Sequence, residues 1–293
     1  MKGLIINNAY NTSATYLNQA QRLKEEFAAL GVETDIRRND FFPAVIEAGK
    51  LALTVSGYDF CVYLDKDKYV SKMLEKAGLR VFNRSKAIEI CDDKMETHIA
   101  LCDRGIPMPK TVSGLLCYTP NATVQKETVD RVENLIGYPV IIKESYGSLG
   151  KGVYKADTRE ELEKKMEELK MIPHLFQEFI AESAGMDIRV IVIGGKTTAC
   201  MMRKSETDFR SNAELGGQAY NYRLSEEISK LCEKTSRILG LDYCGIDVLL
   251  GKGGKPFLCE VNSNAFWGKI EKVTGVNIAR SYALHVIESI NSK

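Results

Sequence analysis

Two acidic side chains near the C-terminal end of the chain have the spacing of a cation site. Asp247 and Glu260 flank Gly253-Gly254. If these glycines form a two-residue hairpin turn, the two carboxylates face each other across paired strands. Like charges in that position destabilise a sheet unless something neutralises them. Asn262 adds a carbonyl oxygen on the same face, so the oxygen-only set predicts Mg²⁺ bound jointly with phosphate. A solvated acidic strand end is the alternative.

A glycine-rich segment, Ser145–Gly152, supplies a second chemical feature, because its backbone N–H groups could wrap a polyphosphate. The candidate contacts are Gly147, Ser148, Gly150 and Gly152. The segment is not a Walker loop, because Lys151 is not followed by Ser or Thr and a strand, not a helix, comes next. Its spacing also excludes the dinucleotide fingerprint. A flexible hairpin tip is the alternative interpretation.

Basic side chains on predicted strands, and just after them, extend the candidate site. Lys143 ends the apolar run Val140–Ile142, where an unpaired ammonium would be costly, so we expect an anionic partner. Four further basic residues follow at irregular spacing: Arg189, Arg203, Lys204 and Arg210. The planar donor fork of arginine suits phosphate and carboxylate oxygens. The pattern predicts a functional cluster, with ordinary surface salt bridges as the alternative for any one member.

The first 90 residues alternate short apolar runs with helical patterns. This alternation predicts a small parallel sheet flanked by helices. The predicted strands are Leu4–Ile6, Val32–Ile36, Phe60–Leu64 and Leu79–Phe82, and the predicted helices are Thr15–Leu30 and Tyr69–Ala77. A further helix is expected over Asp92–Asp103, ended by the two prolines of Gly105–Pro109.

Strands dominate the rest of the chain. They are expected at Tyr138–Lys143, Val153–Ala156, Leu175–Ile180, Ile188–Ile193, Thr197–Met202, Gly245–Leu250 and Pro256–Val261. The first two flank the glycine-rich segment and should form a hairpin. Helices are expected at Thr158–Leu169, Glu226–Leu239 and Val276–Ile290. We therefore expect an α/β fold with three parts: an N-terminal domain (1–90), a central lobe with the glycine loop (91–175) and a C-terminal lobe with the metal-binding hairpin (176–293).

The composition is that of an ordinary globular protein. Lys plus Arg number 40 against 39 for Asp plus Glu, and a net charge of +1 argues against nucleic acid as a partner. The eight cysteines are scattered without a C-x-x-C pair, as expected in a reducing cytoplasm. Signal-peptide and membrane-spanning patterns are lacking, so no membrane is expected. His98, His174 and His285 lack metal-ligand spacing and are interpreted as structural.

From about residue 90 onward, the order of the motifs resembles that of the ATP-grasp ligases, and most closely the RimK branch. The motifs are Asp93-Lys94, Pro139–Lys143 with its glycine loop, Gln177–Ile180, Asp187–Arg189, Asp208–Asn212 with Gly216-Gly217, Gly245–Asp247 and Glu260–Asn262. The resemblance implies an ATP-grasp fold, in which two lobes clasp ATP. The first 90 residues resemble the usual leading domain of that superfamily more loosely.

The resemblance also implies a set of nucleotide-binding residues beyond the glycine loop. They are Lys94, Lys143, Gln177, Glu178, Phe179, Ile180, Asp187 and Arg189. Within this set, Lys94 and Lys143 would hold the α- and β-phosphates. The backbone of Glu178 and Phe179 would meet the adenine edge, and Glu178 or Asp187 would take the ribose.

For the metal, the resemblance implies the same three residues as the hairpin geometry, with two Mg²⁺ ions expected and Mn²⁺ as an alternative. The residues expected to stabilise the γ-phosphate in transfer, and then an acyl phosphate, are Arg203, Arg210 and Asn212. Segment Asn262–Gly268 departs from the Ser-Pro-Gly found in many relatives. Because it should border the acceptor pocket, the acceptor is the least defined part of the resemblance.

The implied activity is ATP-dependent ligation of a carboxylate to an amine through an acyl phosphate, with release of ADP. The RimK branch implies addition of an amino acid such as glutamate to a protein, peptide or cofactor. A kinase that uses the same nucleotide site, and a non-catalytic ATP-binding regulator, are the two alternatives. The expected partners are ATP, a carboxylate substrate and an amine substrate, and a homo-oligomer is an open possibility.

Overall fold

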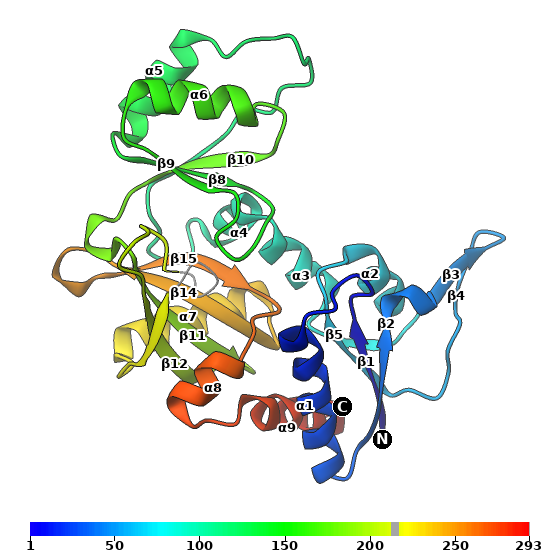
Figure 1. Ribbon diagram of the computed structural model, residues 1–293. Helices are drawn as coiled ribbons and strands as arrows, with labels where there is room; N and C mark the ends of the chain where they lie inside the picture. The colour runs from blue at the N-terminus through cyan, green and yellow to red at the C-terminus, as the bar shows by residue number, and fades with distance from the viewer. Residues whose placement is uncertain (212–216, 293) are drawn as a thin grey trace.

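The computed structural model describes residues 1–211 and 217–292. Its strands form three main sheets and a separate two-stranded ribbon, and each main sheet belongs to a different stretch of the chain (Figure 1). The mixture of one parallel and two antiparallel sheets with surrounding helices is the expected α/β architecture. Among residues 1–211 and 217–292, none of the helices combines the length and the hydrophobicity that a transmembrane span requires.

The first sheet is parallel throughout and has the strand order β2-β1-β5-β6. Its strands are β1 (Lys2–Asn7), β2 (Glu33–Arg38), β5 (Phe60–Leu64) and β6 (Arg80–Phe82), accompanied by helices α1 (Ala14–Ala29) and α2 (Lys68–Lys76). All five residues of β5 are buried, as expected for a strand covered on both faces. The predicted parallel sheet is confirmed.

A hairpin that the sequence did not indicate projects from this unit (Figure 1). It consists of β3 (Ala44–Glu47) and β4 (Lys50–Leu53), which pair with each other and with no further strand of the described residues. Val45 and Ile46 are exposed on it. Because apolar residues here do not alternate with polar ones across a buried face, the pattern used to find strands was missing.

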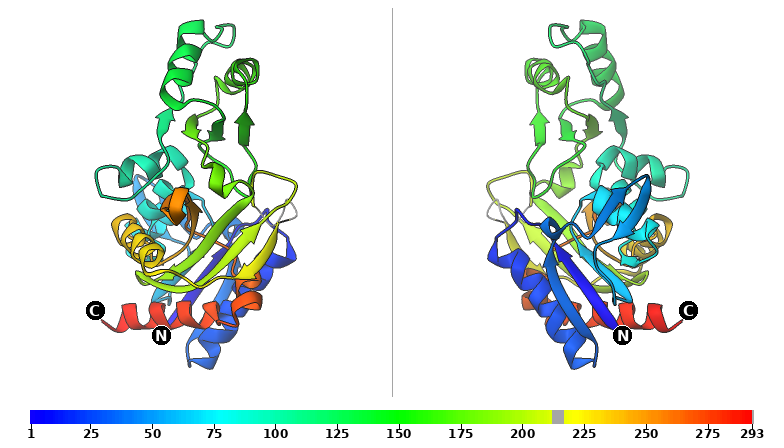
Figure 2. Two further views of the ribbon diagram at one scale, coloured as in Figure 1. Left: turned by 90° about the vertical axis from the view of Figure 1, so that its left-hand side faces the viewer. Right: turned by 90° about the vertical axis from the view of Figure 1, so that its right-hand side faces the viewer.

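The second sheet is antiparallel, with the order β7-β10-β8-β9. Its strands are β7 (Thr111–Ser113), β8 (Val140–Glu144), β9 (Val153–Ala156) and β10 (His174–Glu178), with helices α5 (Lys126–Ile136) and α6 (Arg159–Leu169). Both helices pack on the sheet around a core that includes Val132, Ile142, Leu162 and Phe176. Figure 2 shows this unit standing away from the rest of the molecule. The predicted β8–β9 hairpin is confirmed.

The third sheet has five antiparallel strands in the order β13-β12-β11-β14-β15. These are β11 (Met186–Ile193), β12 (Lys196–Lys204), β13 (Gln218–Asn221), β14 (Tyr243–Leu250) and β15 (Pro256–Asn262). The helices around it are α3 (Ser85–Asp92), α4 (Lys94–Leu101), α7 (Glu226–Leu239), α8 (Gly268–Thr274) and α9 (Ile278–Asn291). Short 3-10 turns lie at Ala181–Ser183 and Lys252–Gly254 beside this sheet, and at Asn39–Phe41 after β2 of the first sheet. One sheet face packs on α3, α4 and α7 through a core that contains Cys91, Leu101 and Cys232.

The opposite face of the third sheet shares a core with the first sheet. Phe27 and Phe60 of the first unit join Ile191, Tyr243 and Tyr282 in one continuous apolar cluster. In Figure 2, α9 (red) lies across the lower end of the molecule, where α1 (blue) crosses it. The first and third units therefore form one packed body, whereas the second unit has its own core.

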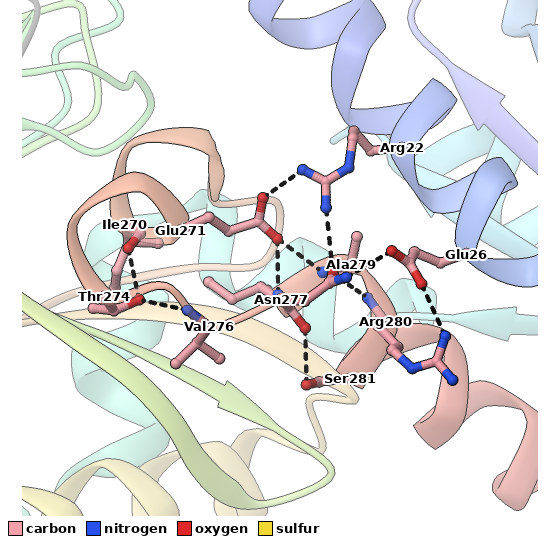
Figure 3. Close-up of polar contacts among 11 residues, drawn as sticks. Arg22, Glu26, Ile270, Glu271, Thr274, Val276, Asn277, Ala279, Arg280 and Ser281 are labelled. Carbon is pink, nitrogen blue, oxygen red and sulfur yellow. Dashed lines mark hydrogen bonds and ion pairs between the residues drawn. The ribbon is translucent and has the colours of Figure 1, made fainter. Parts of the chain in front are cut away.

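A polar network reinforces the contact between α1 and the α8–α9 connection (Figure 3). Arg22 Nη1 donates to Glu271 Oε2 at 2.7 Å, and the other oxygen of Glu271 accepts from the backbone N–H groups of Ile278 and Ala279. Asn277 Nδ2 donates to Glu26 Oε1 at 2.6 Å. Glu271 therefore caps α9 and holds α1 at the same time.

The boundaries predicted between the three parts of the chain lie inside helices and strands, not in the connections between them. Residue 90 lies inside α3, and residues 175 and 176 both lie inside β10, which pairs with β8. The helix expected over Asp92–Asp103 begins instead at Lys94, because the Asp93 carboxylate accepts from the N–H groups of Met95 and Glu96 and caps a new helix after α3. The three-part division itself stays a prediction.

Candidate active site

The predicted pairing of the two acidic residues is confirmed, although the turn that produces it is different. Asp247 is paired with Glu260, and Gly245 with Asn262. The connection is a three-residue turn, Lys252–Gly254, that sets Leu250 opposite Pro256. An irregularity in the ladder, where Cys259 is the extra residue on β15, shifts the register by one position. The bulge thus restores the pairing that a two-residue turn would have produced.

Asp247 lies in a chain of alternating charges on one face of the third sheet. Its carboxylate accepts from Arg189 at both oxygens, with Nη2–Oδ2 at 2.8 Å, and from Arg203 Nη2 at 3.0 Å. Arg203 also binds Asp187 with its donor fork, with Nε–Oδ1 at 2.7 Å. The negative charge at Asp247 is therefore neutralised by two guanidinium groups, a solution that the sequence analysis did not consider.

Burial and charge act in opposite directions on these acids. Burial alone would raise the pKa of Asp247, but Arg189 and Arg203 outweigh it and hold the pKa below its usual range. For Asp187, burial together with the charge of Asp247 outweighs Arg203 and Arg189, and the pKa is raised. The pKa of Arg203 is raised well above its usual value by the two carboxylates, despite burial. Asp247 is thus the fixed negative charge of the sheet face.

The donor set at Asp247, Glu260 and Asn262 fits a hard cation that keeps part of its water shell. Glu260 retains 26% side-chain exposure, and its nearest cation is Lys94 Nζ at 4.0 Å. Each carboxylate oxygen has two lone-pair directions, so the arginine bonds at Asp247 leave acceptor capacity. Within residues 1–211 and 217–292, no three His, Cys, Asp or Glu side chains form a metal-binding group. A cation here would therefore need phosphate or water oxygens as further ligands, as Mg²⁺ commonly does.

Two buried lysines face this acidic edge, and among the described residues the only carboxylate within 4.0 Å of either ammonium is that of Glu260. Lys94 Nζ donates to the carbonyl oxygen of Gly147 at 3.0 Å. Lys143 Nζ donates to Gln177 Oε1 at 2.7 Å and lies 3.7 Å from Cys259 Sγ. Burial lowers the pKa of Lys94, and Lys143 adds to this effect while Glu260 opposes it. Two ammonium groups held by neutral partners favour an anionic ligand.

The glycine loop joins β8 to β9 and is tied to the third sheet by Arg210. The Arg210 guanidinium donates to the carbonyl oxygens of Gly150 at 2.8 Å and Val153 at 3.3 Å, while Asp208 holds its other side. Gly152 has a φ of 70°, and a side chain there would press on Glu144. Ser148 belongs to the same loop. Asn212, expected beside Arg210, lies outside the described residues.

The segment expected to meet adenine leaves the second sheet at the end of β10. Gln177 is buried between Lys143, Thr111 and His98. The Glu178 carboxylate accepts from the backbone N–H of Lys110 at 2.7 Å. Phe179 lies under the ammonium of Lys155, and Ile180 precedes a 3-10 turn. The nucleotide roles of these residues stay predictions.

A cleft of about 1630 Å³ opens between the sheet face, the glycine loop and the first unit. Its lining includes the site residues Ser148, Arg189, Arg203, Glu260 and Asn262, and also Leu149. Asn264 and Phe266, from the segment expected to border the acceptor pocket, also line it. The cleft therefore connects the residues expected to bind phosphate with segment Asn262–Gly268, which is expected to border the acceptor pocket.

Helix α1 forms the far wall of the cleft, which sequence reasoning missed. Tyr16, Gln19 and Arg22 line the cleft at intervals of three residues. Tyr16 meets the ring of Phe266 edge-on, and Gln19 Nε2 donates to the backbone oxygen of Ala265 at 3.2 Å. Polar residues at helical spacing were the available signal, but nothing local in the sequence links them to residues about 250 positions away.

The chain is similar in sequence to a known family and to several curated proteins. Residues 91–287 match the model of the RimK-like ATP-grasp domain. Beta-citrylglutamate synthase B of Danio rerio is 36% identical over 235 residues, which cover 79% of this chain and 56% of that protein. A probable alpha-L-glutamate ligase of Psychromonas ingrahamii is 34% identical over 277 residues, which cover 90% of this chain and 89% of that one.

Among solved structures, the ATP-grasp ligase PsnB complexed with minimal precursor, Mg and ADP has a TM-score of 0.71. The identity is 19%, and the match covers 98% of this chain and 97% of that chain. The expected ATP-grasp fold is therefore confirmed. The chain spans about half the length of the synthases that it matches, 56% for the Danio rerio protein and 51% for N-acetylaspartylglutamate synthase A of Homo sapiens.

Proposed function

Because the chain belongs to the RimK-like ATP-grasp family, we propose that it is an ATP-dependent ligase that joins a carboxylate to an amine and releases ADP and phosphate. The names of its relatives, a beta-citrylglutamate synthase and a probable alpha-L-glutamate ligase, support glutamate as the amino acid that is added. In that case the amine is the amino group of glutamate, and the partner is a small molecule or peptide with a free carboxylate.

The reaction has two steps. An oxygen of the substrate carboxylate attacks the γ-phosphorus of ATP, the bond to the β–γ bridging oxygen breaks, and ADP and an acyl phosphate form. The amine nitrogen then attacks the acyl carbon, phosphate leaves, and the nitrogen loses a proton. Neither step needs a covalent bond to the protein, so the side chains act by positioning and by neutralising charge.

The described residues suit these tasks by location. Lys94 and Lys143 would hold the α- and β-phosphates, because each is a buried ammonium beside the glycine loop. Arg203 lines the cleft and Arg210 reaches the loop, so they are suited to the transferred phosphoryl group. Asp247, Glu260 and Asn262 would hold Mg²⁺, whose chemistry is to neutralise the triphosphate and polarise the γ-phosphoryl group. The Mg and ADP named in the PsnB complex support this use.

One observation carries the proposal. Asp187, Arg189, Arg203, Asp247, Glu260 and Asn262 all lie on a single face of the third sheet, as the strand registers require. Lys94 and Lys143 approach this face from α4 and β8. Acids, guanidinium groups and ammonium groups thus converge on one volume, which is the arrangement that phosphoryl transfer needs.

The test is substrate-dependent release of ADP and phosphate, with the product identified by mass. Glutamate should be supplied with a panel of mono-, di- and tricarboxylates and short acidic peptides. A product heavier than the carboxylate by glutamate minus water supports the ligase. A phosphorylated final product that forms equally well without any amine would contradict the ligase proposal and support a kinase.

The matching variant is Glu260→Ala. We expect roughly a thousandfold or greater loss of turnover, because one of the two carboxylates that would hold the metal is removed. Little loss of stability is expected, because among the described residues the Glu260 side chain makes no polar contact shorter than its 4.0 Å approach to Lys94. Glu226→Ala, which removes an exposed acid of α7, is the control. Near-normal turnover in Glu260→Ala would contradict the proposal that Glu260 is a metal ligand.

A further inference from the structure

A buried line of polar groups links α4 to the lysine proposed to hold phosphate. Lys143 Nζ on β8 donates to Gln177 Oε1 on β10 at 2.7 Å. Gln177 Nε2 lies 2.8 Å from His98 Nε2 on α4 and 2.9 Å from Thr111 Oγ1 on β7. Thr111 Oγ1 in turn donates to the backbone oxygen of Pro109 at 2.8 Å. The line thus crosses from the packed body into the second unit.

Each donor in this line has a fixed direction. An ammonium has donors only, so the Gln177 atom beside Lys143 must be its carbonyl oxygen. The amide nitrogen then points to His98, and His98 Nε2 must accept with a lone pair. A protonated His98 would present an N–H at this position and would oppose the Gln177 amide. Only a neutral histidine that carries its proton on Nδ1 lets Gln177 turn its oxygen toward Lys143.

The surroundings favour that neutral form. His98 is buried, with 6% exposure, and faces the positive charge of Lys143 across Gln177. Burial, assisted by Lys143, lowers the pKa of His98 to about 4. Its own helix places Lys94 one turn earlier on the same face. No acid is among the groups that shift it.

We propose that His98 is a positioning residue, which fixes the Gln177 amide and thereby holds the Lys143 ammonium where it meets a phosphate of the nucleotide. The inference rests on the proposed function, because it takes Lys143 as a phosphate ligand. His98 touches no substrate in this account. It acts through one hydrogen bond, so its effect belongs to nucleotide binding more than to the chemical step.

The experiment measures affinity for a non-hydrolysable ATP analogue with Mg²⁺ by calorimetry, together with KM for ATP and kcat. His98→Leu keeps the buried volume but removes the acceptor. We expect affinity to fall about fivefold to tenfold, the effect of one lost hydrogen bond, and KM to rise by the same factor while kcat changes less than twofold. His98→Gln retains an acceptor and should recover most of the affinity.

Two further variants separate this inference from the proposed function. Lys143→Met tests the nucleotide site itself, and normal affinity in that variant would overturn the site assignment. Weak binding by Lys143→Met together with normal binding by His98→Leu would overturn only the role of His98. His174→Gln is the matched control, because His174 is a buried histidine of the second unit whose ring bonds the backbone of Ile172.

A double-mutant comparison excludes a general packing effect. If His98 acts through Gln177, His98→Leu should have no further effect on affinity in a Gln177→Met background. An undiminished effect there would contradict the proposal. If His98→Leu does not fold, His98→Asn takes its place, because its shorter side chain does not reach Gln177.

Discussion

The packed body of the first and third sheets and the unit of the second sheet are held together in different ways. The body shares one apolar core, and a polar network joins α1 to α8 and α9. The second unit has a separate core formed by its own strands and helices. Its contacts with the body near the candidate site are polar: Lys94 to Gly147, Arg210 to Gly150, and His98 to Gln177.

This difference indicates that the two regions contribute different parts of the site. The cleft wall and the acidic sheet face belong to the body, so their geometry is set by folding. The glycine loop and Lys143 belong to the second unit, so their distance from the acids depends on a polar joint. Because the residues of that joint other than His98 belong to the proposed ATP site, nucleotide binding should draw the two regions together.

The largest expected effect on stability lies in the body. Asp247→Ala would leave Arg189 and Arg203 without their shared buried partner. We expect unfolding free energy to fall by about 3–5 kcal/mol, the cost of breaking a buried ion pair from one side. Urea denaturation measures it, and Asp208→Ala, which breaks a more exposed pair with Arg210, is the control. Similar small losses in both variants would contradict the buried-pair account.

The free energy of unfolding should depend on pH through His98, which lies at the contact between the two regions. Its pKa is about 4 in the folded chain against an ordinary 6.5. Between these values the unfolded chain binds a proton that the folded chain does not, so unfolding free energy falls as pH drops from 6.5 to 4. The contribution is on the order of 3 kcal/mol, and above pH 6.5 it is constant.

Denaturation of the wild type and His98→Gln across pH 4 to 8 isolates this contribution. The difference between the two curves should change below pH 6.5 and stay flat above it. Parallel curves over the whole range would mean that His98 is protonated equally in both states.

A smaller effect is expected where α1 meets α8 and α9. Glu271→Gln retains the shape but removes the ion pair with Arg22 and weakens the cap of α9. We expect a loss of about 1 kcal/mol, because charge-assisted bonds exceed neutral ones by roughly that amount. Glu226→Gln, on an exposed pair, should change stability by less than about 0.5 kcal/mol. A single unfolding transition in both variants would agree with one packed body.

The smallest and most local effect is expected in the second unit. Limited proteolysis within residues 145–152 should slow when an ATP analogue and Mg²⁺ are added, because the loop closes over the nucleotide. Arg210→Gln, which loses the bond to Gly150, should be cut faster without nucleotide. Cleavage that is equally fast with and without nucleotide would argue against a covering loop.

Local patterns were sufficient for most of the elements and for part of the site. Apolar runs located the strands of the first sheet and most strands of the other two, and the facing of Asp247 and Glu260 followed from hairpin geometry. The pairing was predicted from a two-residue turn, whereas the structure has a three-residue turn and a bulge at Cys259. Nothing in the sequence indicates that bulge. The exposed β3–β4 hairpin, the short strands β7 and β13, and the helices α3, α5 and α8 were missed.

The remaining parts of the site depend on contacts between distant segments. The pairing of Asp247 with Arg189 and Arg203 arises from the order of strands in the sheet, which hydrophobic periodicity does not specify. His98 was interpreted as structural because no spacing connects it to Gln177, 79 positions away. The wall formed by α1 was overlooked for the same reason.

The central claim is that Asp247 and Glu260 together hold a divalent ion against the nucleotide, and electron paramagnetic resonance of bound Mn²⁺ tests it most directly. Titration in the presence of ADP should give tight binding in the wild type and in Glu271→Gln, and at least tenfold weaker binding in Glu260→Gln. Equal Mn²⁺ affinity in the wild type and Glu260→Gln would contradict the account.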